Sequence, residues 1–559
     1  MNAPAAPSPS HTKCLAAARL WSHRLLSFST VLMVLLFVYT ALKRLRSPFA
    51  FDQVEGSFVT SVWRLAHGLP VYTRPTLDFV PHIYAPVYLY LCAFLSHYLG
   101  DGYLALRLVS IVSALGGMAL IALLVRRETG LTWPGLAAAG IYAACYRPLQ
   151  GWFDIGRVDS LFIFLLILAI YCTRFAPPLV TAIVWLLAFQ TKQVALPIAL
   201  VAILAGYQRP RRAITTLALT AALVIASILW MNHITGGWYG FWLFGSSGSL
   251  PFVFRMFILF LPTGVLLPLS VALLLILAAL FLAPPRATSE ATRFYTFVSV
   301  ATFFSIWYFS AHAGAAVNTL MPLYAWIAIL AGIAIARLYR RIQSAPLESP
   351  VRDALLALLF AAASLQMLGH FYQTGLFVPG PDVLNSRRAF QSQLAAVPGD
   401  IYLISHSYDA ILAGKQPHAD LDAFNVVTNA HPSTLRSQFL DSFHVAIDNR
   451  LFAGFVLDGD ASTYNPGPDS WMPADFEQQY PVRILAAGAL VRPTPDQPVE
   501  KWIYLPCSAL TPALAPVLDA APAVSYGSCP HLSQLAAPVP LDRPSQSLGK
   551  PHFYLIAKP

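Results

Sequence analysis

Charged residues are scarce in this chain. Asp, Glu, Lys and Arg make up 11% of its 559 residues, whereas hydrophobic residues make up 57%. An average soluble domain has about 25% charged residues. Because so few charges cannot cover an ordinary water-exposed surface, we exclude a wholly soluble protein and expect lipid to cover much of this one.

The common sequence signatures of cofactor sites are absent as well. The chain contains no glycine-rich phosphate loop, no dinucleotide-binding glycine motif, and no Cys or His cluster with the spacing of zinc ligands. Its formal net charge of +10 is carried mostly by Lys and Arg in short loops between apolar segments. That distribution is typical of membrane topology. We therefore expect no bound cofactor and no nucleic acid as a partner.

Cysteine is rare too, with six residues in the chain. Cys507 and Cys529 are the only pair in the last third. If that part lies outside the cytoplasm we expect them to form a disulfide, with two free thiols as the alternative. The other four lie in the N-terminal tail or the apolar region, where we interpret them as small buried hydrophobic residues: Cys14, Cys92, Cys145 and Cys172.

Long apolar runs, in contrast, are abundant. They are long enough for membrane-spanning helices, and we expect about eleven of these over residues 25–374, after a disordered cytoplasmic tail of residues 1–24. Two of the runs are short and can instead form a broken pair or a re-entrant hairpin. The expected spans are 25–42, 104–125, 134–150, 159–174, 179–192, 194–208, 213–231, 255–282, 293–311, 317–338 and 352–374.

The orientation follows from the basic loops, which alternate along the chain and are therefore cytoplasmic. With the N-terminus inside, the long first loop of residues 47–103 is external, and its Pro-broken apolar stretches favour helices lying on the membrane surface. Only Lys43, Arg44 and Arg46, next to the first span, violate the alternation. An odd number of crossings places the C-terminus outside.

The sequence pattern changes near residue 375. Short apolar runs at Ile401–Ile404 and Phe452–Leu457 are typical of strands, and Pro432–Phe452 predicts a helix followed by a strand. Weaker strand signals lie at Lys501–Leu505 and His552–Ala557. We expect residues 375–559 to form a soluble extracytoplasmic α/β domain behind a polytopic α-helical membrane domain.

A few ionisable and polar residues flank the spans on the expected external side. Asp52 and Glu55 follow the first span, Arg157 and Asp159 precede the fourth, and Lys192 ends a short apolar run. An ionisable residue at membrane depth is costly and is a functional candidate by default. His312 and Asn318 lie in the external loop before the tenth span.

Structural explanations compete for each candidate. Asp52 and Glu55 can simply start a helix, because acidic side chains favour the first turn. Arg157 and Asp159 can form a structural ion pair. A lysine such as Lys192 can extend to the membrane interface, and His312 can be an ordinary surface histidine.

The order of the motifs resembles a known family. The chain resembles the GT-C superfamily of glycosyltransferases, and more closely its bacterial branch related to protein O-mannosyltransferases and to the aminoarabinose transferases that modify lipid A. The resemblance covers about residues 20–340. It rests on these segments: Asp52-Gln53-Val54-Glu55-Gly56, Gly68-Leu69-Pro70-Val71-Tyr72, Tyr84-Ala85-Pro86-Val87-Tyr88, Arg107-Leu108-Val109-Ser110, Arg157-Val158-Asp159, Thr191-Lys192-Gln193 and Gly314-Ala315-Ala316-Val317-Asn318.

The resemblance implies a polyprenyl-phosphate-linked sugar as donor, an acceptor hydroxyl on a glycan, lipid or protein, no metal, and a place in the bacterial cytoplasmic membrane. Asp52 or Glu55 is the expected catalytic base, since the family's acidic pair is spread over both positions here. Lys192 and Arg157 are the expected ligands of the donor phosphate. The expected substrate-binding residues are Asp159, Tyr84, His312 and Asn318.

Two other functions stay open at this stage. A transporter or flippase for a lipid-linked or small solute would have inverted repeats with matched Gly or Pro interruptions, and no repeat of that kind is evident in the sequence. An inactive scaffold would keep the fold without turnover, because fold alone does not fix function.

Overall fold

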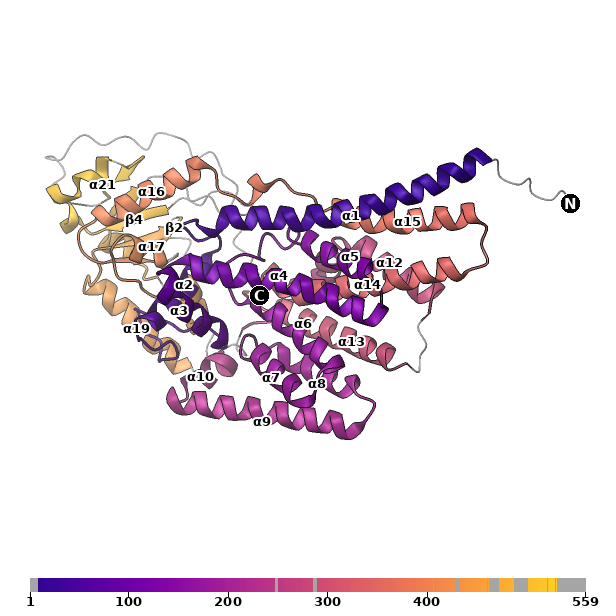
Figure 1. Ribbon diagram of the computed structural model, residues 1–559. Helices are drawn as coiled ribbons and strands as arrows, with labels where there is room; N and C mark the ends of the chain where they lie inside the picture. The colour runs from indigo at the N-terminus through magenta and orange to yellow at the C-terminus, as the bar shows by residue number, and fades with distance from the viewer. Residues whose placement is uncertain are drawn as a thin grey trace.

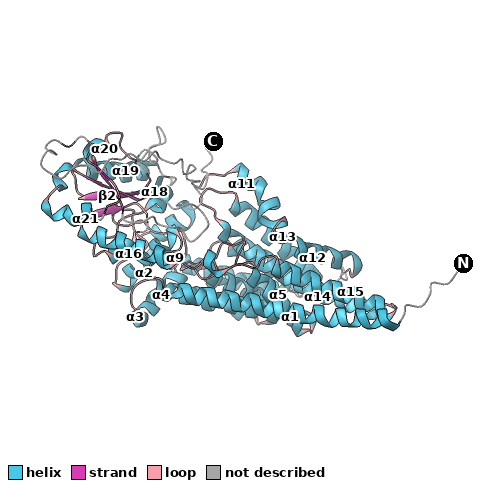
Figure 2. Ribbon diagram, turned by 90° about the horizontal axis from the view of Figure 1, so that it is seen from above, coloured by secondary structure: helices cyan, strands magenta, loops and turns pink. Residues whose placement is uncertain are grey.

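The computed structural model describes residues 9–246, 250–284, 289–405, 407–428, 433–459, 461, 472–486, 501–519, 521–527 and 529. Figure 1 shows a bundle of long helices with a small sheet-containing region at the end opposite the N-terminus. The view from above in Figure 2 shows the same division, with the strands confined to that end.

The first two thirds of the chain are almost entirely helical. Their elements are α1 (Pro9–Leu45), α2 (Gln53–Ala66), α3 (Val87–Leu99), α4 (Tyr103–Thr129), α5 (Thr132–Ala144), α6 (Asp159–Phe175), α7 (Pro178–Phe189), α8 (Ala195–Gly206), α9 (Pro210–Ile234), α10 (Trp238–Gly240), the π-helical η1 (Phe241–Ser246), α11 (Phe254–Leu259), the π-helical η3 (Phe260–Leu266), α12 (Ser270–Leu282), α13 (Glu290–Ser310), the 3₁₀ turn η4 (Val317–Leu320), α14 (Met321–Ser344) and α15 (Ser349–Leu368).

Five of the described helices are long and apolar enough to cross a membrane, or six if one bent pair is a single span. The expectation of about eleven spans goes beyond this count, because several of the expected spans are short helices. The helices α5, α7 and α8 have 13, 12 and 12 residues, or about 20 Å at 1.5 Å per residue, against a hydrocarbon core of about 30 Å.

The bent pair corrects another expectation. Residues 255–282 were expected to form one span, but Phe254–Leu266 and Ser270–Leu282 meet at 78°. Pro268 lies in the break and Pro262 in the preceding π-helical turn. Proline has no backbone N–H to donate and clashes with the preceding turn, which explains the kink.

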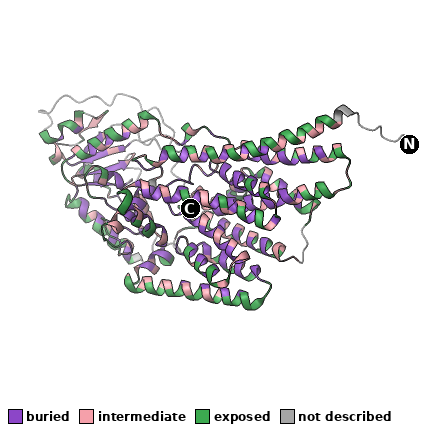
Figure 3. Ribbon diagram, in the orientation of Figure 1, coloured by how far each residue is buried: buried purple, intermediate pink, exposed green. Residues whose placement is uncertain are grey.

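The outer helices expose apolar side chains, as lipid contact requires. Figure 3 shows exposed residues along the outer sides of α1 and α9, whereas the helices between them are largely buried. On α9 the large exposed side chains are Ile214, Ile225, Leu229, Trp230 and Ile234. Patches of this size on a soluble protein would be an interaction surface.

Of the three basic residues that violate the charge pattern, Arg44 is explained by its burial. Its side chain is only 1% exposed, and Nη1 donates to Asp154 Oδ1 at 2.9 Å and to the Gly151 carbonyl at 3.0 Å. A buried arginine that is paired in this way carries no information about the side of the membrane.

The C-terminal third contains a five-stranded mixed sheet with the order β1-β2-β4-β3-β5. β1 runs parallel to β2, and the other pairs are antiparallel. The strands are β1 (Ile401–Leu403), β2 (Gly454–Asp458), β3 (Val482–Leu485), β4 (Lys501–Leu505) and β5 (Val524–Ser525), and the helices are α16 (Pro381–Ala396), α17 (Tyr408–Leu412), α18 (Leu421–Thr428), α19 (Ser433–Asp448), α20 (Phe476–Gln479) and α21 (Ala515–Asp519). Cys507 and Cys529 form a disulfide, and the strand expected at His552–Ala557 lies outside the described residues.

The two faces of this sheet belong to different cores. Ile401, Leu403 and Val456 pack in a small core with α16 and α21. Tyr402 and Phe455 alternate with them, since successive strand residues point to opposite faces, and join the core that continues through the helical part. The sheet region is therefore fastened to the bundle through one of its faces, next to α2.

Candidate active site

Asp52 starts α2 and is open to solvent on one side. Its Oδ2 accepts the Val54 amide at 3.1 Å, which caps the helix. The same oxygen accepts Arg157 Nη1 at 2.8 Å. The side chain is 22% exposed, and Oδ1 accepts no hydrogen bond from any described residue. One oxygen of this carboxylate is thus free for a substrate.

Asp159 starts α6 and is enclosed. Its Oδ1 accepts Lys192 Nζ at 2.7 Å and Asn318 Nδ2 at 3.0 Å. The side chain is only 2% exposed. A carboxylate with its cation and amide partners already in place serves to hold them, so Asp159 positions Lys192 and Asn318.

Arg157 joins the two carboxylates. Besides its contact with Asp52, its Nε lies 3.7 Å from Asp159 Oδ2, and both atoms are buried without a hydrogen-bond partner among the described residues. The guanidinium also lies 4.6 Å from the ring centre of Trp152. Such stacking fixes an arginine plane.

Tyr84 and Lys192 come together because two hydrogen bonds join the loops that carry them. The Val87 amide donates to the Gln190 carbonyl at 2.9 Å, and Gln193 Nε2 donates to the Ile83 carbonyl at 2.6 Å. As a result Lys192 Nζ lies 5.7 Å from the centre of the Tyr84 ring. Arg157 Nη2 is 3.4 Å from the Tyr84 hydroxyl.

Glu55 does not face this space. Its side chain is fully buried and receives Arg107 Nε at 2.8 Å and Arg107 Nη2 at 3.0 Å. The amides of Phe51 and Gly156 donate to it at 2.7 Å each. A carboxylate with four donors and no access to solvent is poorly placed to meet an acceptor, so this geometry favours a structural role for Glu55 over the expected catalytic one.

Arg107, which the sequence offered only as part of a motif, is the charge partner of Glu55. It is fully buried, and besides Glu55 it binds the carbonyls of Ser47 and Phe49, each at 2.6 Å. It therefore fixes the loop that leads from α1 to Asp52. The signal was present in the sequence, because Arg107 lies inside an otherwise apolar span.

His312 lies apart from the other candidates. Its Nδ1 is 2.9 Å from the Tyr308 carbonyl, and its ring packs against Phe252 and Tyr308. None of its described contacts is with Asp52, Arg157 or Lys192. The ordinary-histidine explanation fits this geometry better than substrate binding.

The C-terminal region adds a carboxyl group that the sequence did not reveal. Asp422, on α18, is partly exposed. Burial and the charges of Asp420 and Asp52 raise the pKa of Asp422, and Arg157 acts in the opposite direction. The side chain thus lies within range of the charges of both Asp52 and Arg157, about 370 residues distant in sequence in the case of Asp52.

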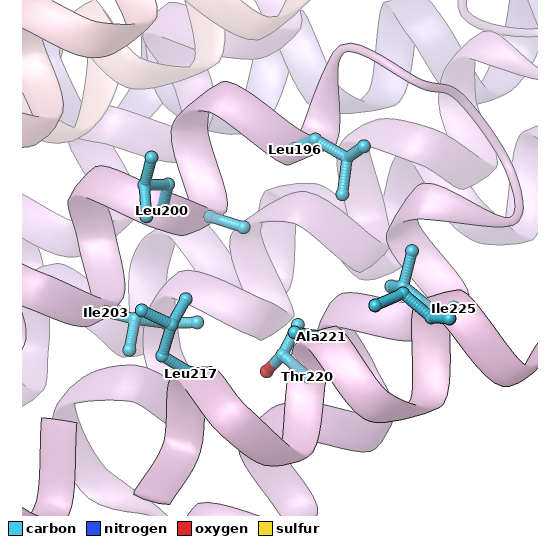
Figure 4. Close-up of a pocket in the computed structure, with 9 residues that line it drawn as sticks. Leu196, Leu200, Ile203, Leu217, Thr220, Ala221 and Ile225 are labelled. Atoms are coloured by element: carbon cyan, nitrogen blue, oxygen red, sulfur yellow. The ribbon is translucent and has the colours of Figure 1, made fainter. Parts of the chain in front are cut away.

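An apolar groove lies between α8 and α9, and one of its lining residues, Leu196 in the first turn of α8, follows Lys192 by four positions in the sequence. Figure 4 shows its side chains gathered from the two helices. Because the helices are antiparallel, the groove runs from the level of Lys192 toward the opposite end. It is lined by Leu196, Ala199, Leu200, Ile203, Leu217, Thr220, Ala221, Val224 and Ile225.

The described fold is a bundle of apolar helices, with two short helices in its first long loop and a terminal α/β region. Solved structures with a similar fold include two of ArnT from Cupriavidus metallidurans. The form bound to undecaprenyl phosphate aligns with a TM-score of 0.53 and 14% identity, over 86% of this chain and 99% of that one. The apo form aligns with a TM-score of 0.53 and 14% identity, over 86% of this chain and 98% of that one.

This likeness confirms the expected fold of a mostly helical apolar bundle, whereas the number of spans and the extracytoplasmic place of the C-terminal region stay predictions. No protein-family profile matches the sequence, and no curated protein does.

Proposed function

We propose that the chain is a membrane glycosyltransferase that moves a hexose or pentose from a polyprenyl-phosphate donor to an acceptor hydroxyl. The observation that carries the proposal is the contact series Asp52–Arg157–Asp159–Lys192, which unites an accessible carboxylate with two cations. The ArnT-like fold supports it, since one of those structures binds undecaprenyl phosphate.

In the proposed reaction the acceptor oxygen attacks the anomeric carbon of the donor sugar. Asp52 takes the hydroxyl proton through its free oxygen. The bond from the anomeric carbon to the phosphate oxygen breaks, and its electron pair leaves with the polyprenyl phosphate. Attack opposite the leaving group inverts the anomeric centre.

Lys192 and Arg157 stabilise the charge that develops on the leaving phosphate. Both are held by carboxylates before the donor arrives, and such preorganised charge is the most effective kind in a site that excludes water. These cations supply the positive charge that a divalent metal supplies elsewhere, and we propose a reaction without a metal. The prenyl chain is proposed to lie along the α8–α9 groove, whose residue Leu196 follows Lys192 by four positions in the sequence.

We place the protein in a bacterial cytoplasmic membrane with the site and the C-terminal region outside. The basic residues at the ends of α4 and α14 lie away from the site and support this orientation.

The test is an assay of the purified full chain in nanodiscs with a panel of radiolabelled undecaprenyl-phosphate sugars. We expect release of undecaprenyl phosphate from at least one donor. The labelled sugar should then be found on an acceptor or, after hydrolysis, as free sugar in solution. Release that is equally fast for Asp52→Asn would reject the proposed chemistry. Movement of intact donor across the membrane without cleavage would favour a flippase.

A further inference from the structure

The loop between α1 and α2, which ends at Asp52, is held by contacts with its backbone and its rings. Arg107 of the helical bundle donates to the Phe49 carbonyl at 2.6 Å. The same guanidinium lies 4.2 Å from the centre of the Phe51 ring. Neither contact holds the carbonyl of Ala50, which is two positions before Asp52.

Arg387 on α16 supplies that contact from the C-terminal region. Its Nη1 donates to the Ala50 carbonyl at 2.8 Å, and its guanidinium lies 5.4 Å from the centre of the Phe49 ring. Phe390 and Leu394, about one and two turns further along α16, pack in the core of the sheet region. Residues at this spacing lie on one side of a helix, so the side of α16 that packs on the sheet also reaches the loop of Asp52.

Arg387 is buried without an ion pair. It is 6% exposed, and no salt bridge joins it to a carboxylate among the described residues. Burial lowers the pKa of its guanidinium, and the charge of Asp409 acts in the opposite direction. A buried charge without a close carboxylate partner adds little to stability, so the contact with Ala50 is better explained by the geometry that it fixes.

We propose that Arg387 is a positioning residue for Asp52, so that the docked C-terminal region forms part of the catalytic site. This inference rests on the proposed function and extends it, because it gives the C-terminal region a role in transfer. Arg107 and Arg387 hold consecutive carbonyls of one loop from two different parts of the molecule. Without Arg387 the loop can shift at Ala50, and a displacement of about 1 Å at a reacting group can cost about 10²-fold in rate.

Steady-state kinetics of the full chain in nanodiscs, with an undecaprenyl-phosphate sugar that wild type turns over, test the inference. Arg387→Met removes the donor to Ala50, and we expect kcat to fall about 10²-fold. The KM for the sugar donor should stay close to that of wild type, because Lys192 is untouched. Arg388→Met, at the exposed neighbouring arginine on α16, is the matched control and should keep the wild-type kcat.

Two further variants separate positioning from folding. Arg387→Gln is too short to reach the Ala50 carbonyl, so it should lose as much kcat, and it replaces Arg387→Met if that variant does not fold. In the Asp52→Asn background, Arg387→Met should cause no further loss, because the group that it positions is already inactive.

A loss of equal size in both backgrounds, or a wild-type kcat in a folded Arg387→Met or Arg387→Gln, would overturn the inference. A wild type that cleaves no donor would instead overturn the proposed function itself.

Discussion

The Nη1 atom of Arg157 donates to Asp52 Oδ2 at 2.8 Å, while Nε of the same guanidinium lies 3.7 Å from Asp159 Oδ2. One cation therefore links the first turn of α2 to the first turn of α6. Asp52 and Asp159 differ in what remains available: Asp52 is 22% exposed and Asp159 is 2% exposed. Because of this difference in exposure, we propose the reactive role for Asp52 and the holding role for Asp159.

Replacing Lys192 tests the donor-phosphate site. Lys192→Met is expected to weaken binding of an undecaprenyl-phosphate sugar at least tenfold, because it removes a cation that Asp159 holds in place. Binding is measured by displacement of labelled donor in nanodiscs. Lys43→Met, an exposed lysine at the end of α1, is the matched control and should bind as wild type does.

The lost lysine also leaves Asp159 with one partner fewer. The double variant Lys192→Met with Asp159→Asn removes that imbalance and should regain stability without regaining donor affinity. Restored affinity in the double variant would show that Lys192 acts only through folding.

Glu55 is predicted to matter for stability. Glu55→Gln leaves the fully buried Arg107 without its charge partner, and breaking a buried pair costs about 3–5 kcal/mol. We expect a markedly lower thermal unfolding temperature and poor expression. A variant with wild-type stability and no transfer activity would return Glu55 to the chemistry.

The pH dependence of stability tests the placement of Asp422. Its pKa in the folded protein is raised to about 8, against about 3.9 for an ordinary aspartate. Between these values the folded state binds more protons than the unfolded state, so the contribution of Asp422 to stability is full below about pH 4 and is lost as the pH rises to about 8.

Asp422→Asn lacks this titration. The unfolding temperature of Asp422→Asn minus that of wild type should therefore increase as the pH rises through that window. A difference that is constant with pH would place Asp422 in water, away from Asp420 and Asp52.

The α8–α9 groove predicts a dependence on the length of the lipid. Ala221→Trp puts a large ring into the groove from its exposed side. We expect a higher KM for an undecaprenyl donor and little change for a geranyl donor, which is too short to fill the groove. Equal effects on both donors would exclude the groove as the site of the chain.

Much of the site was predictable from the sequence because its residues stand out against apolar surroundings. Asp52, Arg157, Asp159, Lys192 and Asn318 are polar groups next to apolar runs, and the structure brings them together. This follows from the alternation of loops, which places the ends of different helices on one side of the membrane.

Other features depend on tertiary contacts that have no local signature. Glu55 shares a helix turn with Asp52, but only the position of Arg107 decides that it is enclosed. Asp422 lies in α18, whose sequence is that of an ordinary amphipathic helix of a soluble domain. Its position relative to the site depends on how the sheet region packs on α2. The expected number of about eleven spans stays a prediction, because hydropathy cannot tell a short buried apolar helix from a membrane-spanning one.

The central claim is that Asp52 is the catalytic base, and transfer by Asp52→Asn tests it most directly. This variant keeps the shape of the side chain and removes its charge. We predict a loss of about 10²–10⁴-fold in the rate of undecaprenyl phosphate release, with donor binding and thermal stability close to those of wild type. Asp101→Asn, a 42% exposed carboxylate in the same loop, should keep full activity. A normal rate for Asp52→Asn would contradict the account.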